Sequence, residues 1–168
     1  MPEALDAIQE ADIIILGPGS LYTSIIPNLL VQGMAEAIQN SPAQKLYICN
    51  IMTQPGETQN YTASEHMKAI FDHVGPIVDQ ILVNSETIPN RLLKKYREKG
   101  AIPVRVDAAN LSRLGVKVWS KYLVQHSNLV RHQPEKLAQA VMEIIAEADV
   151  LERAPVKIYQ PKRAQRGN

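Results

Sequence analysis

The chain has 168 residues, of which 45% are apolar and 21% charged, and these proportions are typical of a folded globular domain rather than a disordered chain. The net charge of +1 gives no overall field that draws a protein to nucleic acid or membrane, so we expect neither as a partner. A single cysteine, Cys49, excludes a disulfide framework and a cysteine-rich zinc site. The amino terminus lacks the apolar core of a signal peptide, and we therefore expect a cytoplasmic protein.

The first predicted elements alternate between helix and strand. Residues 4–9 have a helical pattern and lead into 13–16, an apolar, mainly β-branched run that predicts a buried parallel strand. Pro27 suits a first helical turn, and the apolar residues after it predict an amphipathic helix that ends at Asn40. Residues 46–49 are predicted to form the second strand.

The second half of the chain continues this alternation. Thr62 and Glu65 have the spacing of a capping box, and apolar side chains at helical intervals follow as far as Gly75. The pattern then predicts a strand, a helix, a further strand and a last helix, at residues 81–83, 89–100, 102–106 and 134–145. Residues 116–124 alternate loosely, and the sequence leaves open whether they form an edge strand or a hairpin.

Strands separated by single helices need right-handed crossovers, which build an open parallel sheet. The sequence therefore predicts an α/β fold, a three-layer Rossmann-like open parallel sheet with helices on both faces. Neither GxGxxG nor GxxxxGKS/T is present, so we expect an incomplete domain whose N-terminal half is missing. We assign 1–155 to the C-terminal part of a nucleotide-binding domain and 156–168 to a basic flexible tail. This tail is interpreted as a solvated terminus, with a phosphate-binding arm as the alternative.

The ends of the predicted strands are the places to look for a ligand site. In open α/β sheets, ligands bind beyond the carboxyl ends of the strands, where the next helices present free N–H groups. The predicted strand ends are polar or contain glycine, at residues 17–20, Asn50, residues 84–86 and Asp107. Short polar residues also form ordinary turns and helix caps, but their gathering at one edge of the sheet favours a ligand site.

The segment GPGSLYTSIIPNLL begins at Gly17, directly after the first predicted strand. Gly17 and Gly19 permit a positive φ and the close approach of a ligand. Hydroxyl groups lie beside the N-terminus of the following helix, on Ser20, Thr23 and Ser24. This combination suits a phosphate. The alternative is turn geometry alone, because strand-to-helix loops often contain two glycines.

The segment CNIMTQPGETQNYT begins at Cys49 and forms a long polar loop between a strand end and a capped helix. Connections of this kind usually have about two to six residues, and longer ones are often functional. Amide, hydroxyl and carboxylate groups are dense here, on Asn50, Thr53, Gln54, Glu57 and Thr58. They suit hydrogen bonding to a sugar or a base, whereas a surface loop that packs on itself is the alternative.

In order and spacing, GPGSLYTSIIPNLL, YICNIMTQPGET, NYTASEHMKAI and ILVN resemble the gluconeogenesis-factor (YvcK) branch of the CofD-like family. The resemblance is close up to residue 85 and looser from there through LVRH. The transferase branch, which resembles 2-phospho-L-lactate transferases, usually has an asparagine-containing loop where this chain reads GPGSLYT. This difference favours the regulator branch, and the same segment adds Tyr22 to the ligand-binding candidates.

The resemblance implies a Rossmann-like fold, a cytoplasmic location, binding of a UDP-sugar, and a role in cell shape and envelope supply during growth on gluconeogenic carbon. A nucleotide-sugar-binding regulator is therefore the main hypothesis. The first alternative is a transferase that moves a phospholactyl group from a nucleotide diphosphate donor with the help of Mg²⁺. No catalytic residue can be assigned to it, because the family's GGGTG-type phosphate loop and acidic, glycine-rich segment are not in this sequence. The second is a nucleic-acid or partner-binding module that acts through the basic tail.

The resemblance also implies that Tyr96 and Arg131 meet the UDP-sugar. The ring of Tyr96 would stack on the uracil, and the guanidinium of Arg131 would match the diphosphate oxygens. Completion of an apolar helix face by Tyr96 and an ordinary surface position for Arg131 are the alternatives. His66 and His73 lie seven residues apart and do not form a helical zinc pair, so no metal site is predicted. The sequence leaves a homo-oligomer open.

Overall fold

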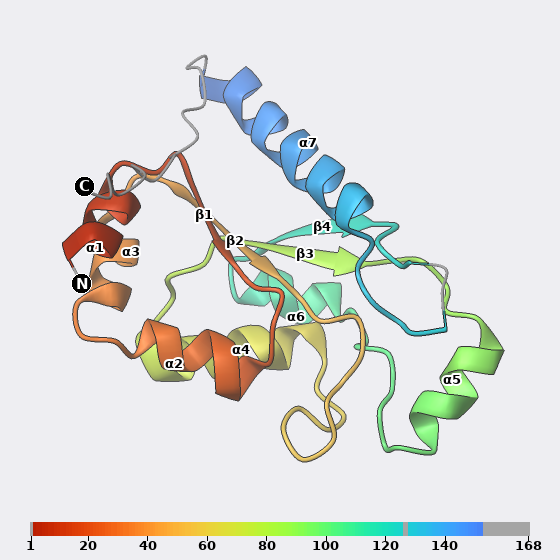
Figure 1. Ribbon diagram of the computed structural model, residues 1–168. Coiled ribbons are helices and arrows are strands. Elements are labelled where there is room, and N and C mark those ends of the chain that lie inside the picture. The colour runs from red at the N-terminus through yellow and green to blue at the C-terminus, as the bar shows by residue number, and fades with distance from the viewer. Residues whose placement is uncertain (1, 126–127, 153–168) are drawn as a thin grey trace, which may run out of the picture.

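The computed structural model describes residues 2–125 and 128–152, and the predicted tail at 156–168 lies outside the described residues. Within these residues, the centre is one sheet of four parallel strands in the order β1-β2-β3-β4 (Figure 1). The strands are β1 (Ile13–Leu16), β2 (Gln44–Ile48), β3 (Gln80–Asn84) and β4 (Lys117–Lys121). Because the strands are parallel, their carboxyl ends lie at one edge of the sheet.

The two inner strands are buried on both faces. Leu46 and Tyr47 of β2 and Ile81 and Leu82 of β3 are completely buried. Successive side chains of a strand point to opposite faces, so each pair contributes to both sides of the sheet. Strands of this kind are continuous apolar runs in the sequence, and the predictions at 46–49 and 81–83 are confirmed with small shifts of their ends.

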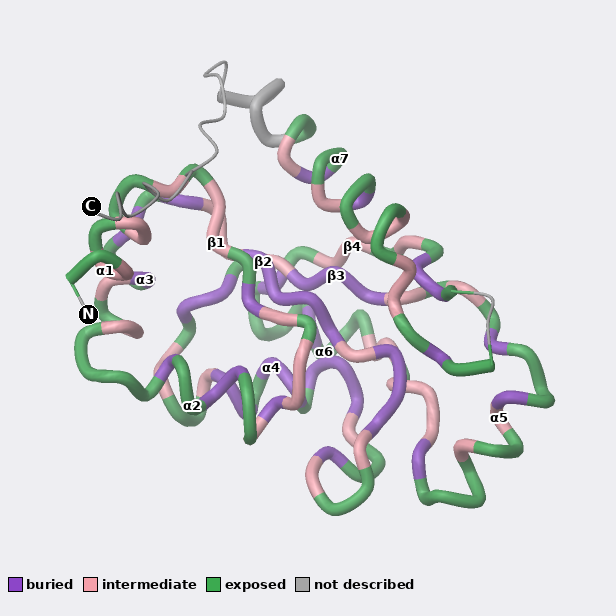
Figure 2. The backbone as a smooth tube through the Cα atoms, viewed as in Figure 1, coloured by how far each residue is buried: buried purple, intermediate pink, exposed green. Residues whose placement is uncertain are grey.

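One face of the sheet is covered by η1 (Leu21–Ile25), α2 (Ile26–Leu29), α4 (Ala63–Val74) and α6 (Ala108–Arg113). The helical side chains packed deepest against this face are Leu21, Met67, Ile70 and Leu111. The opposite face carries α7 (Pro134–Glu152), whose Ala140 and Ile144 pack with Leu46, Leu82 and Leu123. Figure 2 shows buried positions recurring along α7 among exposed ones. Helices on both faces confirm the predicted three-layer α/β fold.

The predicted capping box fixes the start of α4. The Thr62 hydroxyl accepts the N–H of Glu65, and the Glu65 carboxylate accepts the N–H of Thr62 at 2.7 Å. Each side chain thus satisfies a backbone donor that has no partner inside the helix. The long polar loop after β2 therefore ends at a fixed point.

The single helix predicted over residues 27–40 is interrupted in the structure. Helical backbone begins earlier, at η1, and α2 ends at Leu29. A turn follows, and α3 (Met34–Asn40) begins after Gly33, which has a φ of 80°. This left-handed conformation does not occur inside a right-handed helix, which is the reason for the break. The new helix α3 packs against α1 (Pro2–Gln9).

The strand predicted at residues 102–106 is wrong. Pro103 has no N–H to give to a ladder, and the segment makes only isolated bridges, from Pro103 to Met52 and from Arg105 to Thr62. The fourth strand is β4, inside the segment 116–124, and it pairs in parallel with β3 at the edge of the described sheet. Of the two alternatives for that segment, the edge strand is confirmed.

Of the two helices that flank this misassigned segment, one was predicted from the sequence and the other was not. The helix α5 (Asn90–Arg97) follows Pro89 as expected. The short helix α6 was not predicted, because a run of six residues is too short to show a clear helical period.

Candidate functional site

A cavity of about 430 Å³ lies at the carboxyl ends of β1 and β2, and we call it the β1–β2 cavity. Three segments line it: Pro18, Gly19 and Ser20 after β1; Asn50, Ile51, Met52 and Gln54 after β2; and Val130, Arg131 and His132 before α7. These segments are far apart in the sequence, and the first two come together because the strand order places β2 beside β1. The predicted candidates Gly19, Ser20, Asn50, Gln54 and Arg131 therefore share one cavity.

Side-chain amides tie the first two segments together. The Asn50 amide donates to the carbonyl of Gly19 at 2.8 Å, and the Gln54 amide donates to the Ser20 hydroxyl at 2.8 Å. A longer bond of 3.4 Å joins Asn50 to Gln54. The floor of the cavity is thus a hydrogen-bonded unit, and its geometry is fixed before any ligand arrives.

Arg131 supplies the positive charge of the β1–β2 cavity. Its side chain is exposed, and no Asp or Glu is among the described residues that line the cavity. Backbone bonds position the segment that carries it: the Arg131 carbonyl accepts the N–H of Gln125 at 2.9 Å, and the Tyr96 hydroxyl accepts the N–H of Val130 at 3.0 Å. A guanidinium binds an anion well when neutral polar groups surround it and no carboxylate competes for its N–H groups.

Other predicted candidates point into the protein. The Thr53 hydroxyl accepts the N–H of Ile102, and the Thr58 hydroxyl accepts the N–H of Gln54, both at 3.0 Å. Both threonines are buried, so these hydroxyls hold the loop in shape. Glu57 is half-buried, and one of its carboxylate oxygens has no hydrogen-bond partner in the described structure. None of the three lines the β1–β2 cavity.

The remaining candidates of the first loop also lie outside this cavity. Gly17 has a φ of 88°, and a Cβ there would lie 3.1 Å from the carbonyl oxygen of Ile48. The predicted positive φ is therefore correct for Gly17, whereas Gly19 has an ordinary φ. Thr23 and Ser24 are exposed on η1.

Tyr22 faces α4 instead of the β1–β2 cavity. Its hydroxyl lies 2.9 Å from that of Tyr61, and its ring meets the ring of His73 edge to face. The hydrogen bond with Tyr61, together with burial, raises the pKa of Tyr22 to about 12. The phenol is therefore neutral at physiological pH.

Asp107 does not stand at a strand end, because no strand forms at 102–106. It precedes α6, and its carboxylate accepts the N–H of Ser64 at 3.0 Å, the hydroxyl of Ser64, and the amide of Asn110 at 2.9 Å. Burial by itself would raise the pKa of Asp107, but the hydrogen bonds from Ser64 and Asn110 outweigh it and lower the pKa to about 2. Asp107 joins α6 to α4 and does not line the cavity.

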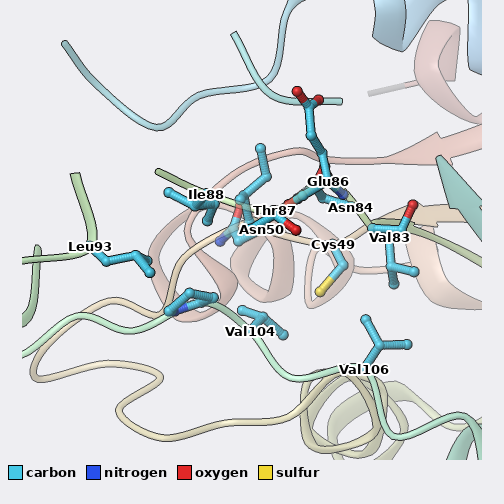
Figure 3. A pocket seen from close by; sticks show the side chains of 13 residues that line it. Cys49, Asn50, Val83, Asn84, Glu86, Thr87, Ile88, Leu93, Val104 and Val106 are labelled. Carbon is cyan, nitrogen blue, oxygen red and sulfur yellow. Dashed lines mark hydrogen bonds between the residues drawn. The ribbon is translucent and has the colours of Figure 1, made fainter. Parts of the chain in front are cut away.

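A second cavity, of about 320 Å³, lies at the ends of β2 and β3, and we call it the β2–β3 cavity. Figure 3 shows Val104 and Val106 on one side of it, and Cys49, Val83 and Asn50 on the other. Asn50 and Ile51 line both cavities, so the two spaces are neighbours. Burial raises the pKa of the Cys49 thiol to about 12, so this sulfur is protonated and unreactive as a nucleophile at neutral pH.

The sequence prediction did not include His132 or the apolar residues of the same cavity lining among the site residues. His132 lies in the β1–β2 cavity next to Arg131, and burial lowers its pKa, so the ring is neutral at physiological pH. The signal was available in the LVRH segment, where a histidine follows the arginine. Among the described residues, no group of three His, Cys, Asp or Glu side chains is arranged to hold a metal ion. Over the same residues, no helix has the length and apolar character that crossing a membrane requires.

Parallel strands wrapped in helices, with polar loops gathered at the carboxyl ends, define a Rossmann-like α/β protein. Residues 1–124 match the family described as 2-phospho-L-lactate transferase CofD, and the chain belongs to this family.

Relatives narrow the comparison within the family. The gluconeogenesis factor of Bacillus subtilis (strain 168) is 48% identical over 149 residues, which cover 88% of this chain and 47% of that protein. The gluconeogenesis factor of Halalkalibacterium halodurans is 52% identical over 143 residues, which cover 84% of this chain and 44% of that protein. The chain thus spans about half the length of the curated relatives it matches.

A crystal structure of a protein from Bacillus halodurans is similar to most of this chain. It has a TM-score of 0.82 and 51% sequence identity, and the match covers 84% of this chain and 46% of that one. Together with the curated relatives, this similarity confirms the resemblance to the gluconeogenesis-factor branch that the sequence motifs indicated.

Proposed function

We propose that the chain binds a nucleotide sugar, with UDP-sugars preferred, and acts in the cytoplasm as a regulator that supports cell shape and envelope supply during gluconeogenic growth. The observation that carries the proposal is the β1–β2 cavity, which Arg131 lines together with the hydrogen-bonded loop residues Gly19, Ser20, Asn50 and Gln54. The curated relatives named gluconeogenesis factors support the biological role.

The chemistry of this cavity favours a diphosphate over a neutral ligand. Arg131 offers paired N–H donors in the geometry of two phosphate oxygens, and within the described part of the chain no lining carboxylate opposes the charge of the ligand. The fixed amides and the Ser20 hydroxyl add neutral polar partners, which orient the ligand without repelling it. A nucleoside diphosphate linked to a sugar presents this kind of anion between two neutral parts.

The alternative is a transferase, in which a substrate hydroxyl attacks the diphosphate of a nucleotide donor with the help of Mg²⁺. The description of the matching family favours it. Such a reaction releases a nucleoside monophosphate. Incubation with a nucleotide diphosphate donor, an acceptor alcohol and Mg²⁺, followed by chromatography, distinguishes an enzyme from a binding protein by the appearance of that product.

Thermal unfolding tests binding directly. A ligand present at a hundred times its Kd stabilises the native state by about 2.7 kcal/mol and therefore raises Tm. We expect UDP-glucose to raise Tm more than GDP-mannose or ADP-glucose at the same concentration, because the proposal is that UDP-sugars are preferred. Arg131→Ala is expected to reduce the shift and Arg131→Lys to restore part of it, since lysine keeps the charge and loses the paired donors. Arg113→Ala, on the exposed surface of α6, is the matched control. No shift with any of the nucleotide sugars would contradict the proposal.

A further inference from the structure

We propose that the β2–β3 cavity is the subsite for the nucleobase of the ligand whose diphosphate lies beside Arg131. The inference rests on the proposed function and deepens it, because it assigns the two ends of the ligand to two different cavities.

The first argument is the chemistry of the cavity walls. Val83, Val104 and Val106 make one part of the wall of the β2–β3 cavity apolar, and the buried Cys49 adds a protonated thiol there (Figure 3). The flat faces of a base are weakly hydrated and gain from contact with apolar side chains. A sugar carries several hydroxyls, and against valines these would lose their bonds to water without replacement. The walls therefore favour the base over the sugar.

The second argument is the distribution of charge between the cavities. Arg131 lines the β1–β2 cavity, and among the described residues no Lys or Arg lines the β2–β3 cavity. The carboxylate that lines the latter belongs to Glu86, and it accepts the Lys136 ammonium and the N–H of Val124, each at 3.2 Å. Its charge is paired, so it does not repel a nucleotide. The diphosphate is thus attracted to the first cavity, and the neutral base fits the second.

The third argument is continuity. Asn50 and Ile51 line both cavities, and the Asn50 amide is held by Gly19 and Gln54. A ligand with its diphosphate at Gly19 therefore reaches the β2–β3 cavity by passing Asn50. Ser85 and Thr87 line the β2–β3 cavity, are exposed, and carry hydroxyls that suit the polar edge of a base.

The fourth argument is that the segment carrying Ser85 and Thr87 has a fixed shape. Asn84 donates to the carbonyl of Glu86 and accepts the N–H groups of Glu86 and Leu123, and the Ser85 N–H donates to the carbonyl of Lys121. A segment with its own polar groups bonded in this way is organised before binding. This reduces the conformational entropy that the protein loses on binding and allows the subsite to discriminate between bases.

The test separates the base from the phosphates. Isothermal titration calorimetry measures UDP, GDP, ADP and inorganic pyrophosphate on the wild-type chain and on Val104→Phe, which fills the cavity with a larger apolar side chain. We expect the best nucleoside diphosphate to bind Val104→Phe at least tenfold more weakly, with the affinity for pyrophosphate changed less than twofold. Val74→Phe is the matched control, because Val74 is a half-buried valine that packs against the same core and does not line the cavity.

A milder variant covers the case in which Val104→Phe does not fold. Thr87→Val keeps the size of an exposed lining residue and removes its hydroxyl, so it should weaken the nucleoside diphosphate severalfold and leave pyrophosphate unchanged. Equal losses for both ligands, or no loss in either variant, overturn the nucleobase subsite. If the wild-type chain binds pyrophosphate as tightly as UDP, GDP and ADP, the subsite is also overturned while the phosphate site stands. If it binds none of these ligands, the proposed function itself fails.

Discussion

Tyr96 illustrates how one residue supports two different hypotheses. The family resemblance implied that its ring stacks on the uracil. In the structure, the Tyr96 ring packs with the cluster around Ile88 and Val130, and its hydroxyl accepts the N–H of Val130, the residue before Arg131. Tyr96 lines neither cavity. This geometry favours a positioning role, in which Tyr96 fixes the segment that presents the guanidinium.

The two roles of Tyr96 predict different results for one conservative substitution. Tyr96→Phe keeps the ring and removes the hydroxyl. If Tyr96 positions Arg131, nucleoside diphosphate binding weakens about two- to tenfold, the range that corresponds to one hydrogen bond. Calorimetry checks this, and Tyr122→Phe, at a tyrosine that is 69% exposed, is the control. If Tyr96→Phe binds as the wild type does, the hydroxyl does not hold the Arg131 segment in place and the positioning role is wrong.

The candidate site was predictable for residues whose position in the fold follows from their closeness to a strand end. Gly19, Ser20 and Asn50 lie within four residues of a strand end, and the edge of a parallel sheet brings such positions together. Thr53 and Thr58 were indistinguishable from them in the sequence. Whether a loop hydroxyl faces a ligand or its own backbone depends on the path of the loop, and here both hydroxyls accept backbone N–H groups.

At the scale of elements, local signals predicted better than long-range ones. The helix α4 was predicted because Thr62 and Glu65, within four residues of sequence, have the spacing of a capping box that indicates a helix start. Residues 102–106 read as a strand because Val104 and Val106 alternate with other residues, yet these valines line the β2–β3 cavity. That β3 pairs with Lys117–Lys121 instead is a long-range choice. The local pattern of residues 102–106 does not indicate that β3 pairs with a different segment.

The contact between α4 and α6 makes a prediction about stability. Asp107→Asn keeps the size of the side chain and removes the charge that accepts the Ser64 hydroxyl and N–H. We expect the free energy of unfolding at pH 7 to fall by about 1 to 2 kcal/mol, as for a hydrogen bond to a charged group at a partly exposed position. Urea unfolding measures it, and Asp72→Asn, in an exposed pair with Lys68, is a control that should change stability little.

The pH dependence of this effect has a definite sign. The pKa of Asp107 is about 2 in the folded protein, below its ordinary value of 3.8, so folding favours the ionised carboxylate. Its contribution is complete above pH 3.8 and is lost as the pH falls through about 2. The difference between wild type and Asp107→Asn should therefore shrink over this range. A difference that is constant between pH 7 and pH 2 would assign the effect to packing instead of charge.

At the scale of the whole molecule, the sheet presents an edge at β1. Ile15 of this strand is 41% exposed although it is an apolar residue in a parallel strand, where burial on both faces is usual. The chain spans about half the length of its curated relatives, 47% for the Bacillus subtilis protein and 44% for the Halalkalibacterium halodurans protein. The β1–β2 cavity lies at the end of this same strand. We therefore expect the affinity of this cavity for a nucleotide sugar to differ between a half-length chain and a full-length relative.

The last prediction compares a part with a whole. The matched 143-residue region of the Halalkalibacterium halodurans gluconeogenesis factor, produced alone, should bind a UDP-sugar at least tenfold more weakly than that protein at full length. The physical reason is that the family resemblance implies a further glycine-rich phosphate loop outside the region shared with this chain, and each lost charge-assisted contact costs about 1.4 kcal/mol or more, which is a factor of ten. Calorimetry on both proteins and on this chain measures it, with circular dichroism as the check of folding. Equal affinities for the region and the whole protein would mean that the loops around Gly19, Asn50 and Arg131 suffice for binding.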